Sequence, residues 1–149
     1  SSPLVDVFTS GDGLYFCYKI PSMMQTQDGT LLAFAEGRNP TCSDFASTDL
    51  VYKRSDDLGK TWSSLRVLYS NSTTEESNVI GNAAPVQIAS SGRILVPFCR
   101  NNHDVLLTYS DDDGKTWSTP RDISSQATRP TWAWIGTGPP ASLQLQSGR

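Results

Sequence analysis

The sequence lacks any apolar run near the roughly 18 residues that a membrane-spanning helix requires, so we expect no transmembrane segment. It also lacks a basic excess, because 12 basic residues stand against 15 acidic ones and the net charge is −3. This balance offers no electrostatic footprint for nucleic acid, and we expect no nucleic-acid partner. With 37% hydrophobic residues, the composition is that of a globular domain.

Cysteine and histidine are sparse. Cys17, Cys42 and Cys99 are an odd number at wide spacing, which fits neither a disulfide framework nor a CxxC metal site. We expect buried or half-buried thiols, with one bridge possible. His103 is the only histidine and has no second metal ligand near it, so we expect no metal and no cofactor. The sequon Asn71-Ser72-Thr73 favours a lysosomal or extracellular location over a cytoplasmic one.

Helical periodicity is almost absent, and short β-branched and aromatic runs recur between turn residues. This pattern predicts an all-β fold. Hairpin turns are expected at 27–30 and 90–93, where a glycine can adopt a positive φ. The predicted strands are Tyr15–Lys19, Ser22–Gln25, Leu31–Arg38, Asp49–Ser55, Arg66–Tyr69, Ala84–Ile88, Ile94–Arg100, Val105–Ser110 and Ser142–Gln146.

The chain contains an internal repeat. Residues 55–63 and 110–118 differ only at Leu58 and Asp113, and the two copies begin 55 residues apart. The wider unit repeats as well: a turn, two strands, the repeated motif and a further strand. A recurring four-stranded unit of this length is typical of a β-propeller blade. An EF-hand interpretation fails because Asp122 occupies the place of the final glutamate and flanking helices are absent from the pattern.

The repeated motif has a structural interpretation. Its serine and aspartate can bond backbone N–H groups of the turn, its glycine supplies a left-handed position, and its tryptophan anchors the return to a strand. We therefore expect Asp57, Asp112, Trp62 and Trp117 to stabilise turns rather than to take part in catalysis.

The Ser-x-Asp-x-Gly-x-Thr-Trp motif is the Asp box, and the chain resembles the sialidase (neuraminidase) family of glycoside hydrolases. An ordered set of segments carries this resemblance, beginning with a counterpart of the family's Tyr/Phe-Arg-Ile-Pro element and a strand ending in arginine. The segments are Tyr18–Ser22, Leu32–Arg38, Val51–Ser55, Asn82–Val86, Trp134–Pro139 and Leu143–Leu145.

The resemblance implies a six-bladed β-propeller with about 55 residues per blade. Residues 1–149 would then form the N-terminal part of a single propeller domain, covering roughly its first two to three blades, with Asp boxes at 55–62 and 110–117. The length is accordingly expected to mark a truncation rather than a complete domain.

The resemblance also implies a site in which three arginines bind the sialic acid carboxylate, an aspartate is the acid/base and a glutamate-assisted tyrosine is the nucleophile. Arg38 corresponds to one arginine and Asp44 to the acid/base. Asp49 competes with Asp44, which is preferred because it lies on the loop after the arginine. Lys19 occupies the place of the first arginine, and lysine lacks the planar fork that grips a carboxylate.

Two further residues correspond to substrate contacts. Asn82 matches a position near the pocket for the N-acyl group, although an asparagine at a strand start can simply satisfy backbone groups. Trp134, together with Trp132, is placed to stack on the sugar's glycerol side chain, although tryptophan also fills cores. The remaining arginine, the tyrosine and the glutamate have no counterparts in this sequence.

The implied function is that of an exo-α-sialidase releasing terminal sialic acids from sialylated glycoconjugates such as glycoproteins, gangliosides and oligosaccharides. The isolated 149 residues are expected to be inactive, because half of the site would be missing. Two alternatives stay open. One is a non-catalytic Asp-box propeller that binds acidic glycans, which Lys19 favours, and the other is a relative that transfers sialic acid to an acceptor other than water.

Overall fold

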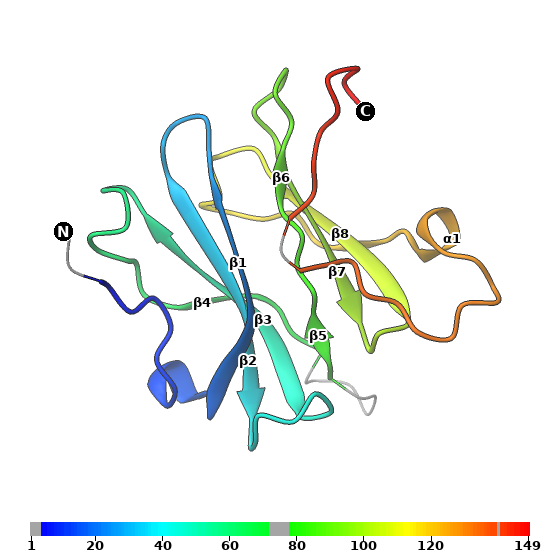
Figure 1. Cartoon of the computed structure of the whole chain (residues 1–149), viewed down its shortest axis with the longest axis horizontal. Helices are drawn as coiled ribbons and strands as arrows, with labels where there is room; N and C mark the ends of the chain where they lie inside the picture. The colour runs from blue at the N-terminus through cyan, green and yellow to red at the C-terminus, as the bar shows by residue number, and fades with distance from the viewer. Residues whose placement is uncertain (1–3, 72–77, 140) are drawn as a thin grey trace.

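The computed structural model of the chain describes residues 4–71, 78–139 and 141–149. Two antiparallel sheets lie side by side, the first blue to green and the second green to yellow in Figure 1. Short helical turns, η1 (Asp12–Leu14) and α1 (Ser124–Ala127), lie outside the sheets. The strands are β1 (Cys17–Gln25), β2 (Leu31–Asn39), β3 (Ser47–Ser55), β4 (Arg66–Tyr69), β5 (Ile80–Gly81), β6 (Val86–Gln87), β7 (Ile94–Arg100), β8 (Asp104–Ser110) and β9 (Arg121–Asp122).

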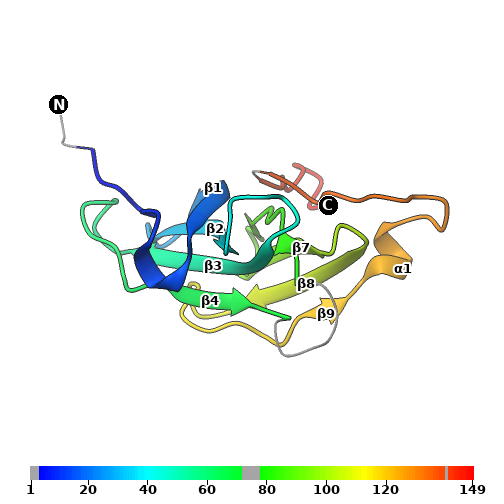
Figure 2. The same cartoon turned by 90° about the horizontal axis from the view of Figure 1, so that it is seen from below.

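Each sheet is an up-and-down blade. The first has the order β1-β2-β3-β4, and the second has the order β5-β7-β8-β9 with β6 also paired to β7. Figure 2 shows β4 and β9 at the same side of the molecule, opposite β1 and the C-terminal segment. The all-β prediction is therefore confirmed, with two propeller blades in the described part of the chain.

The first strand of each blade is irregular at the same relative place. In β1, the register to β2 shifts between Lys19 and Ser22, and Ile20 has a left-handed φ of 49°. In the second blade, β5 and β6 form two pieces along one edge of β7, and Asn82 between them has a φ of 57°. A positive φ is uncommon for a β-branched residue such as Ile20, so the backbone there is held against its preference.

One apolar core joins the two blades. Trp117, from the second Asp box, packs edge-on against Phe34 and Tyr52 of the first blade, with ring centroids 6.0 and 5.8 Å apart. Edge-to-face aromatic pairs add to the free energy of area burial. The buried members of this cluster are Leu32, Phe34, Leu50, Tyr52, Ile80, Ala83, Ile94, Val96, Phe98 and Leu106.

Each Asp box closes its own turn through one carboxylate. The Thr61 backbone N–H donates to Asp57 Oδ1 at 2.9 Å, and the Thr61 hydroxyl donates to Asp57 Oδ2 at 2.6 Å. The Gly59 N–H donates to the Ser55 hydroxyl, and Gly59 has a φ of 84°. The second box repeats these bonds around Asp112. This geometry supports the structural interpretation of both aspartates.

The position at which the boxes differ connects the blades. Asp113 Oδ2 accepts a hydrogen bond from the Thr30 hydroxyl at 2.5 Å and one from Arg54 Nη2 at 3.4 Å. Both partners belong to the first blade. The first box has Leu58 at this position, and that side chain is exposed. The second motif therefore fixes its own turn and also holds the neighbouring sheet.

Several strand predictions need correction. Residues 142–146 are not a strand: Leu143 and Leu145 are exposed, and the segment makes isolated bonds such as Ser142 N–H to the Pro85 carbonyl instead of a ladder. Tyr15 precedes β1, which spans Cys17–Gln25 and joins two predicted strands, with its register shift at the gap between them. The short strands β5 and β9 were not predicted, because two-residue segments carry no alternation that a sequence pattern can reveal.

The sequon at 71–73 extends into residues 72–77, which lie outside the described residues. Among the residues described, no helix is long and apolar enough to cross a membrane.

The Asp boxes make the folded state less stable as the pH becomes acidic. Hydrogen bonds from the side chains and backbones of Thr61 and Thr116 lower the pKa of Asp57 and of Asp112 to about 2, from a usual value of 3.8. Since the folded pKa lies below the unfolded one, this stabilisation is present above about pH 4 and is lost as the pH falls toward 2. We expect Asp57→Asn/Asp112→Asn to lower Tm at pH 6 and to flatten the fall in Tm below pH 4.

Thermal unfolding followed by circular dichroism from pH 6 to pH 2 measures this effect. Asp28→Asn, in the exposed turn between β1 and β2, is the matched control and should leave the curve unchanged. A double variant whose Tm parallels that of the wild type throughout would contradict the prediction.

Candidate functional site

A cavity of about 290 Å³ is lined by residues of both blades. Four predicted site residues line it: Arg38, Asp44, Asn82 and Trp134. They come from separate places in the fold, namely the end of β2, the loop between β2 and β3, the break between β5 and β6, and the C-terminal segment. The fold therefore brings together most of the residues that the sequence analysis selected.

Arg38 is the centre of this cavity wall. It lies near the end of β2, opposite Cys17 on one side and Thr48 on the other. Its side chain is only 4% exposed. Nη2 and Nε both donate to Glu36 Oε2, at 2.6 and 3.2 Å, and Nη1 donates to Asp44 Oδ1 at 2.7 Å. The guanidinium is thus held from two sides by carboxylates.

Glu36 joins the two blades at the site. Its Oε2 holds Arg38, while its Oε1 accepts the Asn82 backbone N–H at 3.1 Å. The contact depends on Gly81, because a Cβ at that position would overlap the Glu36 carboxylate. Glu36 was not among the predicted site residues. Its place two residues before Arg38 on a strand, and so on the same face, was the available signal.

The electrostatics keep Arg38 charged. Burial lowers the pKa of Arg38, but the hydrogen bonds and charges of Glu36 and Asp44 outweigh this effect and raise it above its usual value. The two carboxylates differ in burial, with side-chain exposures of 7% for Glu36 and 83% for Asp44. An anionic ligand can therefore replace Asp44 at Nη1 with little desolvation, whereas Glu36 stays in place.

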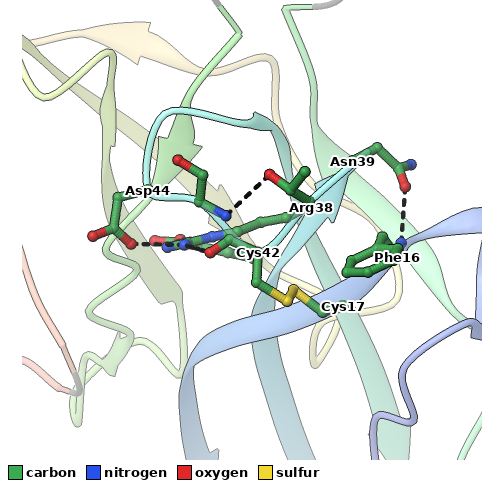
Figure 3. Close-up of a disulfide and its surroundings, with 9 residues drawn as sticks. Phe16, Cys17, Arg38, Asn39, Cys42 and Asp44 are labelled. Carbon is green, nitrogen blue, oxygen red and sulfur yellow. Dashed lines mark hydrogen bonds and ion pairs between the residues drawn. A yellow bond between two sulfur atoms is a disulfide. The ribbon is translucent and has the colours of Figure 1, made fainter.

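Asp44 lies on a loop that is covalently anchored. Cys42 forms a disulfide with Cys17 of β1, and the Cys42 carbonyl accepts a hydrogen bond from Arg38 Nη1 at 2.8 Å (Figure 3). The sequence predicts free thiols with one bridge possible; this pair forms that bridge, and Cys99 is the buried free thiol. Burial raises the pKa of the Cys99 thiol. Spacing alone could not distinguish the pair, because the β1–β2 register brings position 17 beside the loop.

The competing aspartate lies elsewhere. Asp49 Oδ2 accepts a hydrogen bond from the Tyr15 hydroxyl at 2.7 Å, and its Oδ1 accepts one from Asn78 Nδ2 at 2.9 Å. It pairs with Gly37, one residue away from Arg38, and so projects to the opposite face of the sheet. Asp49 and Tyr15 line a different hollow from Arg38. Of the two aspartates, Asp44 lines the cavity with Arg38 and Asp49 does not.

Lys19 does not line the cavity. Its side chain is exposed and borders a separate small hollow with Phe8 and Tyr18. In the β1–β2 ladder, however, it lies directly opposite Glu36. Paired residues of an antiparallel ladder project to the same face, so Lys19 shares the face of the Glu36–Arg38 pair without contacting it.

The second wall is formed around Asn82. The Asn82 carbonyl accepts a hydrogen bond from the Thr137 hydroxyl at 2.6 Å, which ties the C-terminal segment to the break between β5 and β6. Trp134, on that segment, is 68% exposed and lines the cavity, whereas Trp132 does not. Within the described residues, no group of three His, Cys, Asp or Glu side chains is arranged to hold a metal ion.

The repeated motif and the two-blade fold agree with comparisons to known proteins. A family model described as a BNR repeat-like domain matches residues 18–149. The chain belongs to the BNR-repeat sialidase family. It is 30% identical to an exo-alpha-sialidase of Aspergillus fumigatus, over 96% of this chain and 42% of that protein. The chain thus spans well under half the length of this family member.

Solved structures of family members agree on the fold. A Hadza microbial sialidase superposes with a TM-score of 0.73 at 28% identity, covering 80% of this chain and 28% of the other. A Trypanosoma rangeli sialidase gives a TM-score of 0.63 at 16% identity, covering 81% of this chain and 25% of the other, and shows the fold alone. The two blades are therefore part of a sialidase-type propeller.

The two carboxylates around Arg38 should contribute unequally to stability. Glu36→Ala leaves Nε and Nη2 of a buried guanidinium and the Asn82 N–H without their acceptor, and we expect it to lower the free energy of unfolding by about 3 kcal/mol. Asp44→Ala removes an exposed partner and should cost less than about 1 kcal/mol. Urea unfolding measures both values, and equal losses would contradict the assignment of Glu36 as the structural partner.

Proposed function

We propose that the protein containing this chain is an exo-α-sialidase, a glycoside hydrolase that releases terminal sialic acids from glycoproteins, gangliosides and oligosaccharides. The observation that carries the proposal is a buried, permanently charged guanidinium that lines a cavity beside an exposed carboxylate, 2.7 Å from it. Sialic acid bears a carboxylate on its anomeric carbon, and a guanidinium is the protein group that best matches this anion.

In this proposal Arg38 binds the substrate carboxylate. Glu36 fixes the plane of the guanidinium, and the incoming anion takes over the hydrogen bond that Nη1 makes to Asp44. Once released from Arg38 and open to solvent, Asp44 in its protonated form donates its proton to the glycosidic oxygen as general acid. The carboxylate that results later accepts a proton from water as general base. Asn82 and Trp134 would contact the remainder of the sugar from the opposite wall.

We assign no nucleophile to this chain. The Tyr15 hydroxyl is committed to Asp49, and burial together with that aspartate raises its pKa, which disfavours the phenolate. It also lies away from the cavity of Arg38. We propose that residues 1–149 form one part of a single propeller domain whose other blades complete the site, in keeping with the share of its relatives that the chain spans.

The proposal predicts a specific loss in the full-length protein. Asp44→Asn should lower kcat for release of sialic acid from sialyl-lactose by about 100- to 10,000-fold, the usual contribution of general acid/base catalysis. Asp49→Asn is the matched control, because it changes an aspartate on the opposite face, and it should keep most of the activity. If Asp49→Asn instead caused the larger loss, the acid/base assignment would be wrong.

Lys19 gives a second prediction. Because Lys19 pairs with Glu36 in the β1–β2 ladder and the next residue, Ile20, lines the cavity, Lys19→Arg should supply a forked guanidinium to the substrate carboxylate. We expect kcat/KM for sialyl-lactose to rise about tenfold, the equivalent of one added charge-assisted hydrogen bond. Lys19→Gln is the control and should lower kcat/KM. No gain with Lys19→Arg would show that position 19 does not contact the substrate.

The same assay separates the alternatives. No turnover by the full-length protein, together with binding of sialylated glycans on an array, would indicate a binding propeller rather than an enzyme. Formation of sialylated lactose from a sialoside donor and added lactose would indicate transfer in place of hydrolysis.

A further inference from the structure

We propose that the Cys17–Cys42 disulfide is a positioning element of the catalytic site, holding the Asp44 loop in place while Arg38 exchanges its loop contacts for the substrate. The inference rests on the proposed function. The sequence pattern assigns no role to this disulfide, and neither do the names of the related proteins. The disulfide is also separate from the hydrogen-bond network formed by Arg38, Glu36 and Asn82.

The bond joins two of the segments that carry candidate site residues. Cys17 is 4% exposed, lies opposite Arg38 in the β1–β2 ladder and precedes Lys19 by two residues. Cys42 precedes Asp44 by two residues. Figure 3 shows the disulfide on one side of the Arg38 side chain, with Asp44 bonded to the guanidinium end. One covalent bond therefore fixes the loop relative to the rigid strand beneath it.

The loop has few other anchors. Residues 41–45 form bonds within the turn, from Ser43 N–H to the Thr41 hydroxyl at 3.3 Å and from Phe45 N–H to the Ser43 hydroxyl at 3.2 Å. Phe45 is 91% exposed and adds no packing. Within the described residues, the side-chain hydrogen bonds that reach residues 41–45 from another strand come from Arg38, to the Cys42 carbonyl and to Asp44. Toward β3, the Ala46 N–H donates to the Ser43 carbonyl at 3.1 Å, and the Thr48 hydroxyl donates to the Ala46 carbonyl at 2.8 Å.

These arginine bonds are the ones that substrate binding must disturb. Both use Nη1, at 2.8 Å to the Cys42 carbonyl and 2.7 Å to Asp44, and a bound carboxylate competes for the same donor. When the substrate carboxylate replaces Asp44 at Nη1, the disulfide remains as an anchor of the loop that no ligand displaces. Proton transfer requires the acid within hydrogen-bond reach of the glycosidic oxygen, and a misplacement of about 1 Å can cost about 100-fold in rate.

The decisive experiment compares leaving groups in the full-length protein. Sialyl-lactose has a poor leaving group that needs protonation by Asp44, whereas an aryl sialoside leaves as a phenolate and needs it less. For Cys17→Ser/Cys42→Ser, we expect kcat/KM to fall about 10- to 100-fold with sialyl-lactose and clearly less with the aryl sialoside. An equal fall with both substrates, or no fall, would overturn the positioning role.

Chemical reduction provides the matched test without substitution. Dithiothreitol reduces the disulfide by two electrons, giving the Cys17 and Cys42 thiols and the cyclic disulfide of the reagent. We expect it to reproduce the double variant's selective loss in the wild type and to have no further effect on the double variant. A similar loss on adding the reagent to the double variant would place the effect at another site and overturn the assignment.

Amide hydrogen exchange tests the anchoring of the loop without relying on the release of sialic acid. Reduction should speed amide exchange at residues 41–46 and leave β7 and β8 unchanged. If the oxidised wild type released no sialic acid from either substrate, the proposed function would fail, and exchange would still test the anchoring of the loop. Unchanged exchange at 41–46 would overturn the inference, because the disulfide would then not anchor the loop. Faster exchange throughout both blades would also overturn it, because the disulfide would then stabilise the whole fold rather than the loop.

Discussion

The buried carboxylate of Glu36 is the interaction on which the two blades and the site both depend. One of its oxygens orients the Arg38 guanidinium, and the other accepts a backbone N–H of the neighbouring blade. Burying a carboxylate costs free energy unless its lone pairs accept hydrogen bonds. Here the Arg38 guanidinium supplies the opposite charge and donors, and the Asn82 N–H supplies a further donor. The packing of the blades and the direction of the arginine therefore cannot be altered separately.

The elements with strong local signals could be predicted from sequence. The Asp boxes bond mainly within themselves, so Ser55, Asp57 and Thr61 identify the turn without tertiary information. The strands β4 and β7 have the predicted bounds because apolar runs between turn residues specify them. Arg38 and Asp44 followed from their place within an ordered set of motifs, and the fold brings them to one cavity with Asn82 and Trp134.

The features that could not be predicted correctly from the sequence depend on residues that are distant along the chain. The alternation of Leu143 and Leu145 suggests a strand, but the chain meets only isolated acceptors there and both side chains stay exposed. The disulfide depends on a strand register that no local pattern encodes. The position of Lys19 depends on the irregular turn of β1 at Ile20, where the backbone adopts a conformation that its own side chain disfavours.

The contact of Asp113 with Thr30 and Arg54 has a consequence for how repeated blades are told apart. The two Asp boxes are interchangeable as turns, because the residues that close them are the same. They are not interchangeable as neighbours, because a leucine at 113 would remove the bonds of Thr30 and Arg54 to the second blade and leave them Asp56 of their own blade. The one position that differs between the two Asp boxes therefore determines which box can bond to Thr30 and Arg54 of the first blade.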